Sequence, residues 1–288
     1  MRSAVHSVLS TPLIFFKKVS QYLGILTTVF LLSACLPEEK EEDTNPINSS
    51  GIEVDDASLA LNGFWVGGFN QTETLKLLIY NGDVFGIDAD KAFFGTVDST
   101  AESSFQFTLL GYSLSYLDTV NEEYASDGGA ISYTIDGRLF NFAELEIAAS
   151  FDTNDAPFGE FNVINDKSYS SNSSLSSLVG MWTTAKYQLR IDREGGFIIL
   201  DTSDSGCVSN GRISLLDNTN SLMVLNISRD KCEEFNGNAS GYAAINLDGE
   251  LEFYSKLGNS LLFMTFAAPT STGSTTTTET TEEAAATE

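Results

Sequence analysis

One stretch of sequence decides the fold class: residues 75–88, which read LKLLIYNGDVFGID. Leu75, Leu77 and Ile79 alternate with other side chains, and a second apolar run, residues 84–88, follows an Asn-Gly pair. Alternation with a period of two is typical of a β-strand with one buried face, and Asn-Gly is a favoured two-residue hairpin turn. The stretch therefore predicts an antiparallel β-hairpin.

A degenerate copy of this region begins 117 residues later. Residues 61–65 (Leu-Asn-Gly-Phe-Trp) precede the first hairpin, and residues 178–182 (Leu-Val-Gly-Met-Trp) hold the corresponding place in the second copy. Residues 187–191 then alternate in the same way, and residues 197–201 return after a Gly-Gly pair. We therefore expect an internal repeat built from hairpins.

Further short apolar runs, separated by turn residues such as Asp136-Gly137, predict the remaining strands. These runs are residues 105–110, 131–135, 139–149, 158–164, 212–216, 222–227, 241–245, 251–254 and 261–266. Residues 142–149 fit either a strand or a helix. Many short strands at such spacing favour small sandwiches or up-and-down barrels. We expect an all-β chain with two antiparallel β domains in tandem, at 58–166 and 173–268.

A Gly-x-Trp on the first strand of a barrel resembles the pattern of lipocalins and related calycins. The residues concerned are Gly63-Phe64-Trp65 and Gly180-Met181-Trp182. In that family the Trp plugs the closed end of the barrel, so the resemblance implies this place for Trp65 and Trp182. The alternative is that both are ordinary core residues. The tandem arrangement also resembles that of uncharacterised two-domain lipoproteins of gammaproteobacteria, which implies no activity.

The first 34 residues have the composition of a secretion signal. Arg2, Lys17 and Lys18 precede a mostly apolar run, residues 23–32. A helix of ten residues spans only about 15 Å, half of the bilayer core, so the run is too short to cross a membrane. We interpret residues 1–34 as a cleaved signal peptide.

The run ends in Leu32-Ser33-Ala34-Cys35, which resembles the lipobox of bacterial lipoproteins. In that family the cysteine is acylated and becomes the first residue of the mature chain. With Leu36 rather than Asp after the cysteine, the resemblance implies a lipid anchor in the outer membrane. The alternative is a simple signal peptide with an incidental cysteine. The polar, acidic composition of segment 35–57 favours the lipoprotein interpretation, because such a segment predicts a flexible linker. The Ser/Thr/Glu segment 269–288 predicts a disordered tail.

The mature chain is strongly acidic. The full sequence has 15 basic and 40 acidic residues, and residues 1–34 contain three basic and no acidic ones, which leaves 12 basic residues and a charge of −28. Such a surface repels nucleic acid and anionic headgroups, so neither is an expected partner. Membrane attachment would depend on the lipid at Cys35.

The two other cysteines flank a predicted hairpin. If its turn is centred near Asn218, Cys207 lies opposite Arg229 or Asp230, close to Cys232. The cell envelope is oxidising, so we predict a structural disulfide between Cys207 and Cys232. The spacing differs from the Cys-x-x-Cys of redox and metal sites.

The composition restricts the available chemistry. The single histidine, His6, lies in the predicted signal, so the mature chain lacks imidazole-based triads, proton relays and zinc ligands. Carboxylate pairs remain, and we predict that they lie on strand surfaces or in solvated turns instead of holding calcium or doing acid–base work. The pairs are Asp88 with Asp90, Asp201 with Asp204, and Glu144 with Glu146. We predict no cofactor, no metal and no catalytic residue.

Three functions remain open. The first is a non-enzymatic binding or scaffolding protein of the envelope, with a protein or glycan partner. The second is a lipocalin-like carrier of a small lipophilic ligand, for which a cavity of several hundred Å³ would be expected. The third is a carboxylate-dependent hydrolase, which requires two carboxylates facing one another across a cleft.

Overall fold

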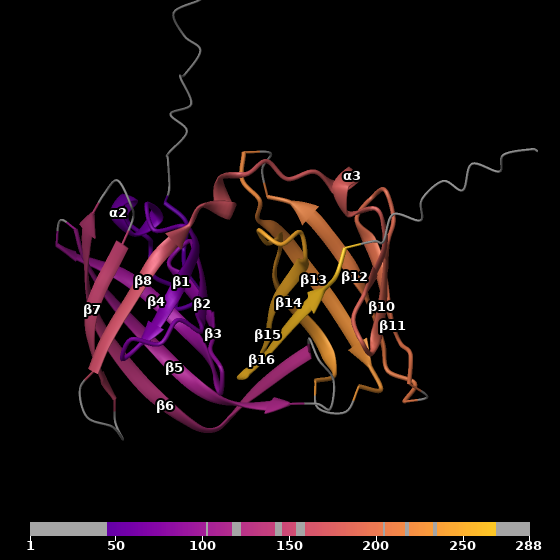
Figure 1. The fold of residues 1–288 in the computed structure, drawn as a ribbon, viewed down its shortest axis with the longest axis horizontal. Coiled ribbons are helices and arrows are strands. Elements are labelled where there is room, and N and C mark those ends of the chain that lie inside the picture. The colour runs from indigo at the N-terminus through magenta and orange to yellow at the C-terminus, as the bar shows by residue number, and fades with distance from the viewer. Residues whose placement is uncertain are drawn as a thin grey trace, which may run out of the picture. The chain divides into compact units, whose positions relative to one another are not determined.

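The computed structural model describes residues 45–101, 103–116, 122–141, 146–153, 159–203, 205–216, 219–232 and 235–268. The predicted signal, Cys35 and the tail lie outside these ranges. Residues 45–288 group into one compact unit, and its described part is almost entirely β-strand (Figure 1). No helix within the described ranges has the length and apolarity needed to cross a membrane. The predicted all-β class is confirmed.

Lobe 1 is an eight-stranded antiparallel barrel that follows a short helical turn, α2 (Asp56–Leu59). Each strand pairs with the next along the chain, and β8 pairs with β1 to close the barrel. The strands are β1 (Gly63–Phe69), β2 (Leu75–Tyr80), β3 (Asp83–Ile87), β4 (Lys91–Ala101), β5 (Ser104–Tyr116), β6 (Glu122–Asn141), β7 (Glu146–Thr153) and β8 (Gly159–Asp166).

The hairpin predicted from residues 75–88 forms as β2 and β3. Asn81 and Gly82 have φ of 49° and 75°, the left-handed conformation that a two-residue hairpin turn requires. Leu75, Leu77 and Ile79 are fully buried in the barrel interior. The predicted alternation therefore corresponds to one real buried face.

The interior of lobe 1 is filled by large side chains. Trp65, Phe93, Phe107 and Phe161 are each at most 1% exposed and belong to one apolar cluster. Lobe 1 is therefore packed around its aromatic residues, as expected for a small barrel.

One predicted turn is wrong. Strand β6 runs through Asp136 and Gly137 without a break, and Gly137 lies opposite Phe105 and Ala149. A Cβ at Gly137 would lie 3.0 Å from the side chain of Ile147. This glycine therefore allows close packing of neighbouring strands instead of forming a turn.

Lobe 2 is a second antiparallel meander. It follows a 3-10 turn, η1 (Lys167–Ser170), and a helical turn, α3 (Leu175–Leu178). Its first and last strands meet through a single bridge, between Thr183 and Ala267. The strands are β9 (Gly180–Thr183), β10 (Tyr187–Ile191), β11 (Gly196–Asp201), β12 (Val208–Leu215), β13 (Met223–Asp230), β14 (Gly237–Ile245), β15 (Leu251–Leu257) and β16 (Ser260–Phe266).

Strand β6 joins the two lobes into one continuous sheet. Its first residues, 122–126, pair with residues 260–264 of β16, while the rest of β6 pairs with β5 and β7 (Figure 1). The side chain of Tyr124 is buried in the core of lobe 2. The division into two domains, residues 58–166 and 173–268, stays a prediction.

The lobes also share an apolar interface. It is formed by outward-facing side chains of both barrels, among them Phe64 and Phe94 from lobe 1 and Tyr254 and Phe263 from lobe 2. The ring centroids of Phe64 and Tyr254 lie 6.1 Å apart. Strands at this interface are buried on both faces, so their sequences lose the alternation that marks a one-sided strand. Strand β4 shows this effect, and the sequence analysis did not predict it.

Candidate functional site

The Trp residues of the two repeats occupy equivalent positions. Each follows a short helical turn and is at most 3% exposed. The indole Nε1 of Trp65 donates to the carbonyl oxygen of Leu61 at 2.9 Å, and that of Trp182 donates to Leu178 at 2.7 Å. Both Trp residues also line a depression beside η1, the turn that connects the two lobes. We call this depression the linker-side cleft. It consists of two hollows, the inner pocket and the outer hollow, which are described next.

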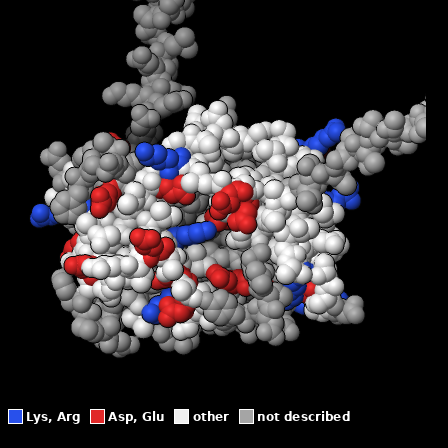
Figure 2. All heavy atoms as spheres, viewed as in Figure 1, with Lys and Arg blue, Asp and Glu red and all other residues white. Residues whose placement is uncertain are grey.

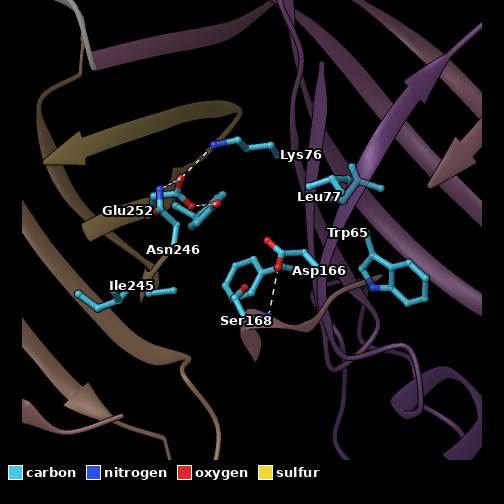
Figure 3. A pocket seen from close by; sticks show the side chains of 12 residues that line it. Trp65, Lys76, Leu77, Asp166, Ser168, Ile245, Asn246 and Glu252 are labelled. Carbon is cyan, nitrogen blue, oxygen red and sulfur yellow. Dashed lines mark hydrogen bonds and ion pairs between the residues drawn. The ribbon is translucent and has the colours of Figure 1, made fainter. Parts of the chain in front are cut away.

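The first hollow, the inner pocket, lies between the lobes and encloses only about 40 Å³ (Figure 3). It is lined by Phe64, Trp65, Val66, Lys76, Leu77, Asp166, Ser168, Ala244, Ile245, Asn246, Glu252 and Tyr254. Figure 3 shows Lys76 reaching from lobe 1 toward Glu252 of lobe 2, with Asp166 on the other side of the pocket.

A polar network fixes the Glu252 carboxylate in this pocket. Its Oε1 lies 3.2 Å from Lys76 Nζ and accepts a hydrogen bond from Asn246 Nδ2 at 3.0 Å. Its Oε2 accepts a hydrogen bond from the Tyr254 hydroxyl at 2.6 Å. Burial, together with the adjacent Glu252 carboxylate, holds the pKa of Tyr254 well above its usual value, so the hydroxyl remains a donor. Both carboxylate oxygens are thus engaged, and the contact with Lys76 is the one that links the two lobes.

Asp166, on the opposite side, caps η1. Its Oδ1 accepts a hydrogen bond from the backbone N–H of Ser168 at 3.1 Å. The pocket therefore does bring two carboxylates together, as the hydrolase hypothesis requires. Both make structural hydrogen bonds, however, and the enclosed volume is close to that of one or two water molecules.

The second hollow, the outer hollow, is larger, about 450 Å³. It shares Ser168, Ile245 and Asn246 with the inner pocket. Trp182 and Met223, both buried in the core of lobe 2, contribute to its lining. The complete lining is Lys167, Ser168, Ser171, Asn172, Ser173, Ser177, Trp182, Ser221, Met223, Ile245, Asn246, Leu247 and Gly249.

Two hydroxyls in the outer hollow are buried without a hydrogen-bond partner among the described residues: Ser173 Oγ and Ser221 Oγ. Their backbones are fixed, because Ser173 N donates to Asn220 O at 3.2 Å and Ser221 N donates to Tyr169 O at 3.0 Å. A buried polar group left unpaired costs about 1–3 kcal/mol. At the rim, the apolar side chain of Leu247 is 76% exposed.

The charges around the middle of the molecule are mainly acidic. On the face drawn in Figure 2, Asp and Glu side chains surround a hollow, and a basic side chain lies among them. In the outer hollow, Lys167 is the only charged residue, and the other polar lining residues are Ser and Asn. The outer hollow thus offers neutral hydrogen-bonding groups beside an apolar surface.

The predicted disulfide is confirmed. The Cys207 and Cys232 sulfurs are bonded at 2.05 Å, with 4.5 Å between the Cα atoms. Val208 lies opposite Asp230 in the β12–β13 hairpin. Lys231 adopts a φ of 56°, which bends the chain after β13 and brings Cys232 to Cys207.

Next to the disulfide lies a buried ion pair that the sequence did not indicate. Arg229 Nη1 and Glu122 Oε1 are 2.7 Å apart, and the two side chains are 1% and 0% exposed. The Tyr187 hydroxyl lies 3.5 Å from Arg229 Nη2. Burial and the Glu122 carboxylate raise the pKa of Tyr187 far above its usual value. The pair links β6 of lobe 1 to β13 of lobe 2.

The acidic pairs singled out in the sequence make local contacts. Asp88 accepts hydrogen bonds from the Thr74 hydroxyl and the Ala89 N–H. Burial opposes ionisation of Asp201, but hydrogen bonds from Ser203 and Ser205 outweigh it and lower its pKa. Asp90 lies 3.7 Å from Lys91 Nζ, and Glu146 is half-buried on β7.

Asp204 and Glu144 lie outside the described residues, as do Leu32, Ser33, Ala34 and Cys35. Among the residues that are described, no three or more His, Cys, Asp or Glu side chains cluster as metal ligands would. Comparison with family models, curated proteins and solved structures found no match.

Proposed function

We propose that this protein is a lipid-anchored, non-enzymatic binding protein of the outer membrane, and that the linker-side cleft holds its ligand. The lipobox-like Leu32-Ser33-Ala34-Cys35 supports the anchor. Of the predicted linker 35–57, residues 45–57 belong to the folded unit, where Val54 is buried and Ser49 bonds to Asp83. The acidic residues 36–44 would separate this unit from the membrane surface.

The observation that carries the binding proposal concerns two residues in the lining of a hollow of about 450 Å³. The hydroxyls of Ser173 and Ser221 are buried beside it without a hydrogen-bond partner among the described residues. Ligand sites are typically concave, of about 300–1,000 Å³, and largely apolar with a few fixed polar groups. A ligand that bonds to both hydroxyls would remove their desolvation penalty on binding.

The lining specifies the kind of ligand. Trp182, Met223 and Leu247 favour an apolar portion, and the serine hydroxyls favour a neutral group that donates and accepts hydrogen bonds. We therefore infer a small, uncharged amphiphile. This reading keeps the expected binding function but differs from the carrier hypothesis, because the ligand lies in the outer hollow and not in a barrel interior; large side chains fill the interior of lobe 1.

Catalysis is not part of the proposal. Glu252 has both carboxylate oxygens engaged, by Lys76 and Asn246 on one side and Tyr254 on the other. A carboxylate held in this way is poorly placed to accept a proton from a substrate or to attack it.

Photo-crosslinking in intact cells tests the site. In one variant, a benzophenone amino acid replaces Leu247 at the rim. In the control variant it replaces Ile198, which is 40% exposed on β11 and is absent from the lining. We expect a small-molecule adduct, detected by mass spectrometry, at position 247 only. Equal labelling at both positions, or no adduct at position 247, contradicts the proposal.

A further inference from the structure

A third hollow, separate from the two that form the linker-side cleft, also lies between the lobes. It encloses about 650 Å³, and no residue of its lining belongs to the cleft. Its walls come from β2–β4 of lobe 1 and from β13–β15 of lobe 2, and we call it the aromatic groove. It is open to solvent along one side.

Four aromatic rings line the groove. Tyr80 and Tyr242, one from each lobe, have ring centroids 5.3 Å apart at an interplanar angle of 63°. Phe85 packs edge-on against Phe94 at 4.9 Å and against Tyr242 at 5.9 Å. The two phenylalanines are at most 8% exposed, whereas the tyrosines are half-buried. Mutual packing therefore holds the tyrosine rings in place.

Two opposite charges lie among these rings. The amino group of Lys256 sits 4.3 Å from the centroid of the Phe94 ring. The Asp83 carboxylate accepts a hydrogen bond from the backbone N–H of Ser49 at 2.9 Å. Burial raises the pKa of Asp83, although Ser49 and the nearby Lys256 charge oppose this. The side chains of Asn81 and Ser240 add neutral polar groups.

This combination fits a particular ligand chemistry. A sugar ring has apolar C–H faces, which pack on aromatic rings, and a rim of hydroxyls, which both donate and accept hydrogen bonds. The groove offers the half-buried rings of Tyr80 and Tyr242, an acceptor at Asp83 and a donor at Lys256. The two charges offset one another, so the groove favours a neutral ligand, while the overall charge of −25 disfavours an anionic one.

We propose that the aromatic groove binds a neutral oligosaccharide of about two or three sugar units, a length that suits its volume. Aromatic–sugar contacts supply most of the affinity, and Asp83 and Lys256 orient the hydroxyls. This site is independent of the linker-side cleft, so either can be lost without the other.

The test uses the mature chain on an array of immobilised oligosaccharides that includes neutral and anionic members, followed by calorimetry with the neutral sugars retained. We expect saturable binding of at least one neutral di- or trisaccharide. No retention of any neutral sugar, or retention of anionic sugars alone, overturns the proposal. Binding to a control array of short peptides but to no sugar does so too.

Variants locate the binding. Tyr242→Leu removes a ring and Lys256→Met removes the donor; each should weaken binding about tenfold, whereas Tyr242→Phe keeps the ring and should retain most of the affinity. Lys91→Met is the matched control, since Lys91 is a surface lysine that pairs with Asp90 outside the groove. An unchanged dissociation constant in both Tyr242→Leu and Lys256→Met overturns the assignment. If Tyr242→Leu fails to fold, Lys256→Met and Asp83→Asn decide the question.

Discussion

Trp65 and Trp182 are equivalent residues in the two lobes, each donating its indole N–H to the carbonyl oxygen four residues earlier, at 2.9 and 2.7 Å. In each lobe this bond ties the first strand to the segment before it: Leu178 is the last residue of α3, and Leu61 lies two residues after the end of α2. The match extends to Gly63 and Gly180, whose φ values are 150° and 143°. The repeat seen in the sequence is therefore also a repeat of hydrogen-bonding geometry.

Replacing either Trp by Phe should destabilise the protein. Trp65→Phe and Trp182→Phe each leave a buried carbonyl unpaired and a small void, at a cost of about 2–4 kcal/mol in the free energy of unfolding. Urea unfolding followed by circular dichroism measures the loss. A change below about 0.5 kcal/mol for both variants would show that the bond is not a structural requirement.

The buried ion pair predicts strongly non-additive effects. Glu122→Gln leaves the Arg229 charge uncompensated and should lower the free energy of unfolding by about 3–5 kcal/mol. The double variant Glu122→Met/Arg229→Met should recover most of this loss, because no buried charge remains. Denaturation of Glu122→Met, Arg229→Met and the double variant, each compared with the native protein, completes the cycle. Additive losses would mean that the two groups act independently.

Asp83 predicts a pH dependence of stability. Burial makes its pKa higher in the folded chain than in the unfolded chain, where it is near 3.8, so ionisation weakens the fold above the folded pKa. Relative to Asp83→Asn, the native protein should therefore be less stable at pH 7, and the difference should fade as the pH drops toward 3.8. Thermal unfolding of both proteins across this range gives the comparison. If Asp83→Asn were instead less stable than the native protein at pH 7, the ionised carboxylate would stabilise the fold and the prediction would be wrong.

The anchor predicts a change of cell fraction. Cys35→Ala removes the thiol that would be acylated, so the protein should leave the outer-membrane fraction and become extractable without detergent. Cys207→Ser/Cys232→Ser should lose stability but stay in the membrane fraction. Immunoblots of fractionated cells show both. Membrane retention of Cys35→Ala would point to an ordinary signal peptide and another means of attachment.

The hairpins and the disulfide could be predicted from the sequence because their signals are local. The pair Asn81-Gly82 predicts a hairpin turn from the conformations that these two residues favour. The alternation of Leu75, Leu77 and Ile79 predicts a strand with one buried face. That Cys232 lies close to Cys207 followed from counting residues around one turn, which placed Arg229 or Asp230 opposite Cys207. No long-range information was needed.

The lobe interface and the ion pair could not be predicted in this way. Phe93 and Phe94 are both buried, one inside the barrel of lobe 1 and the other against lobe 2, so the strand shows no period of two. Glu122 looks like part of an exposed acidic turn, and only the pairing of β6 with β16 places it beside Arg229. Asp136-Gly137 predicts a turn but lies within β6, because an Asp-Gly pair also occurs in strands where neighbours approach closely.

The candidate site was also beyond the sequence. Ser173 and Ser221 lie in segments rich in polar residues, and nothing local distinguishes them from solvated loop serines. They become notable only because backbone hydrogen bonds between residues 169–173 and 220–221 bury their hydroxyls. The nearest sequence signal is Trp182, which the resemblance to lipocalins marks as a barrel plug and which is otherwise an ordinary core residue.

The most direct test of ligand binding in the linker-side cleft is native mass spectrometry of the protein isolated gently from membranes. Ser177→Trp should fill the outer hollow, while Ser176→Trp, on the same helical turn but not in its lining, is the matched control. We predict a small-molecule adduct on the native protein and on Ser176→Trp, and none on Ser177→Trp. An adduct that persists on Ser177→Trp, or a native protein that carries none, would contradict binding in this cleft.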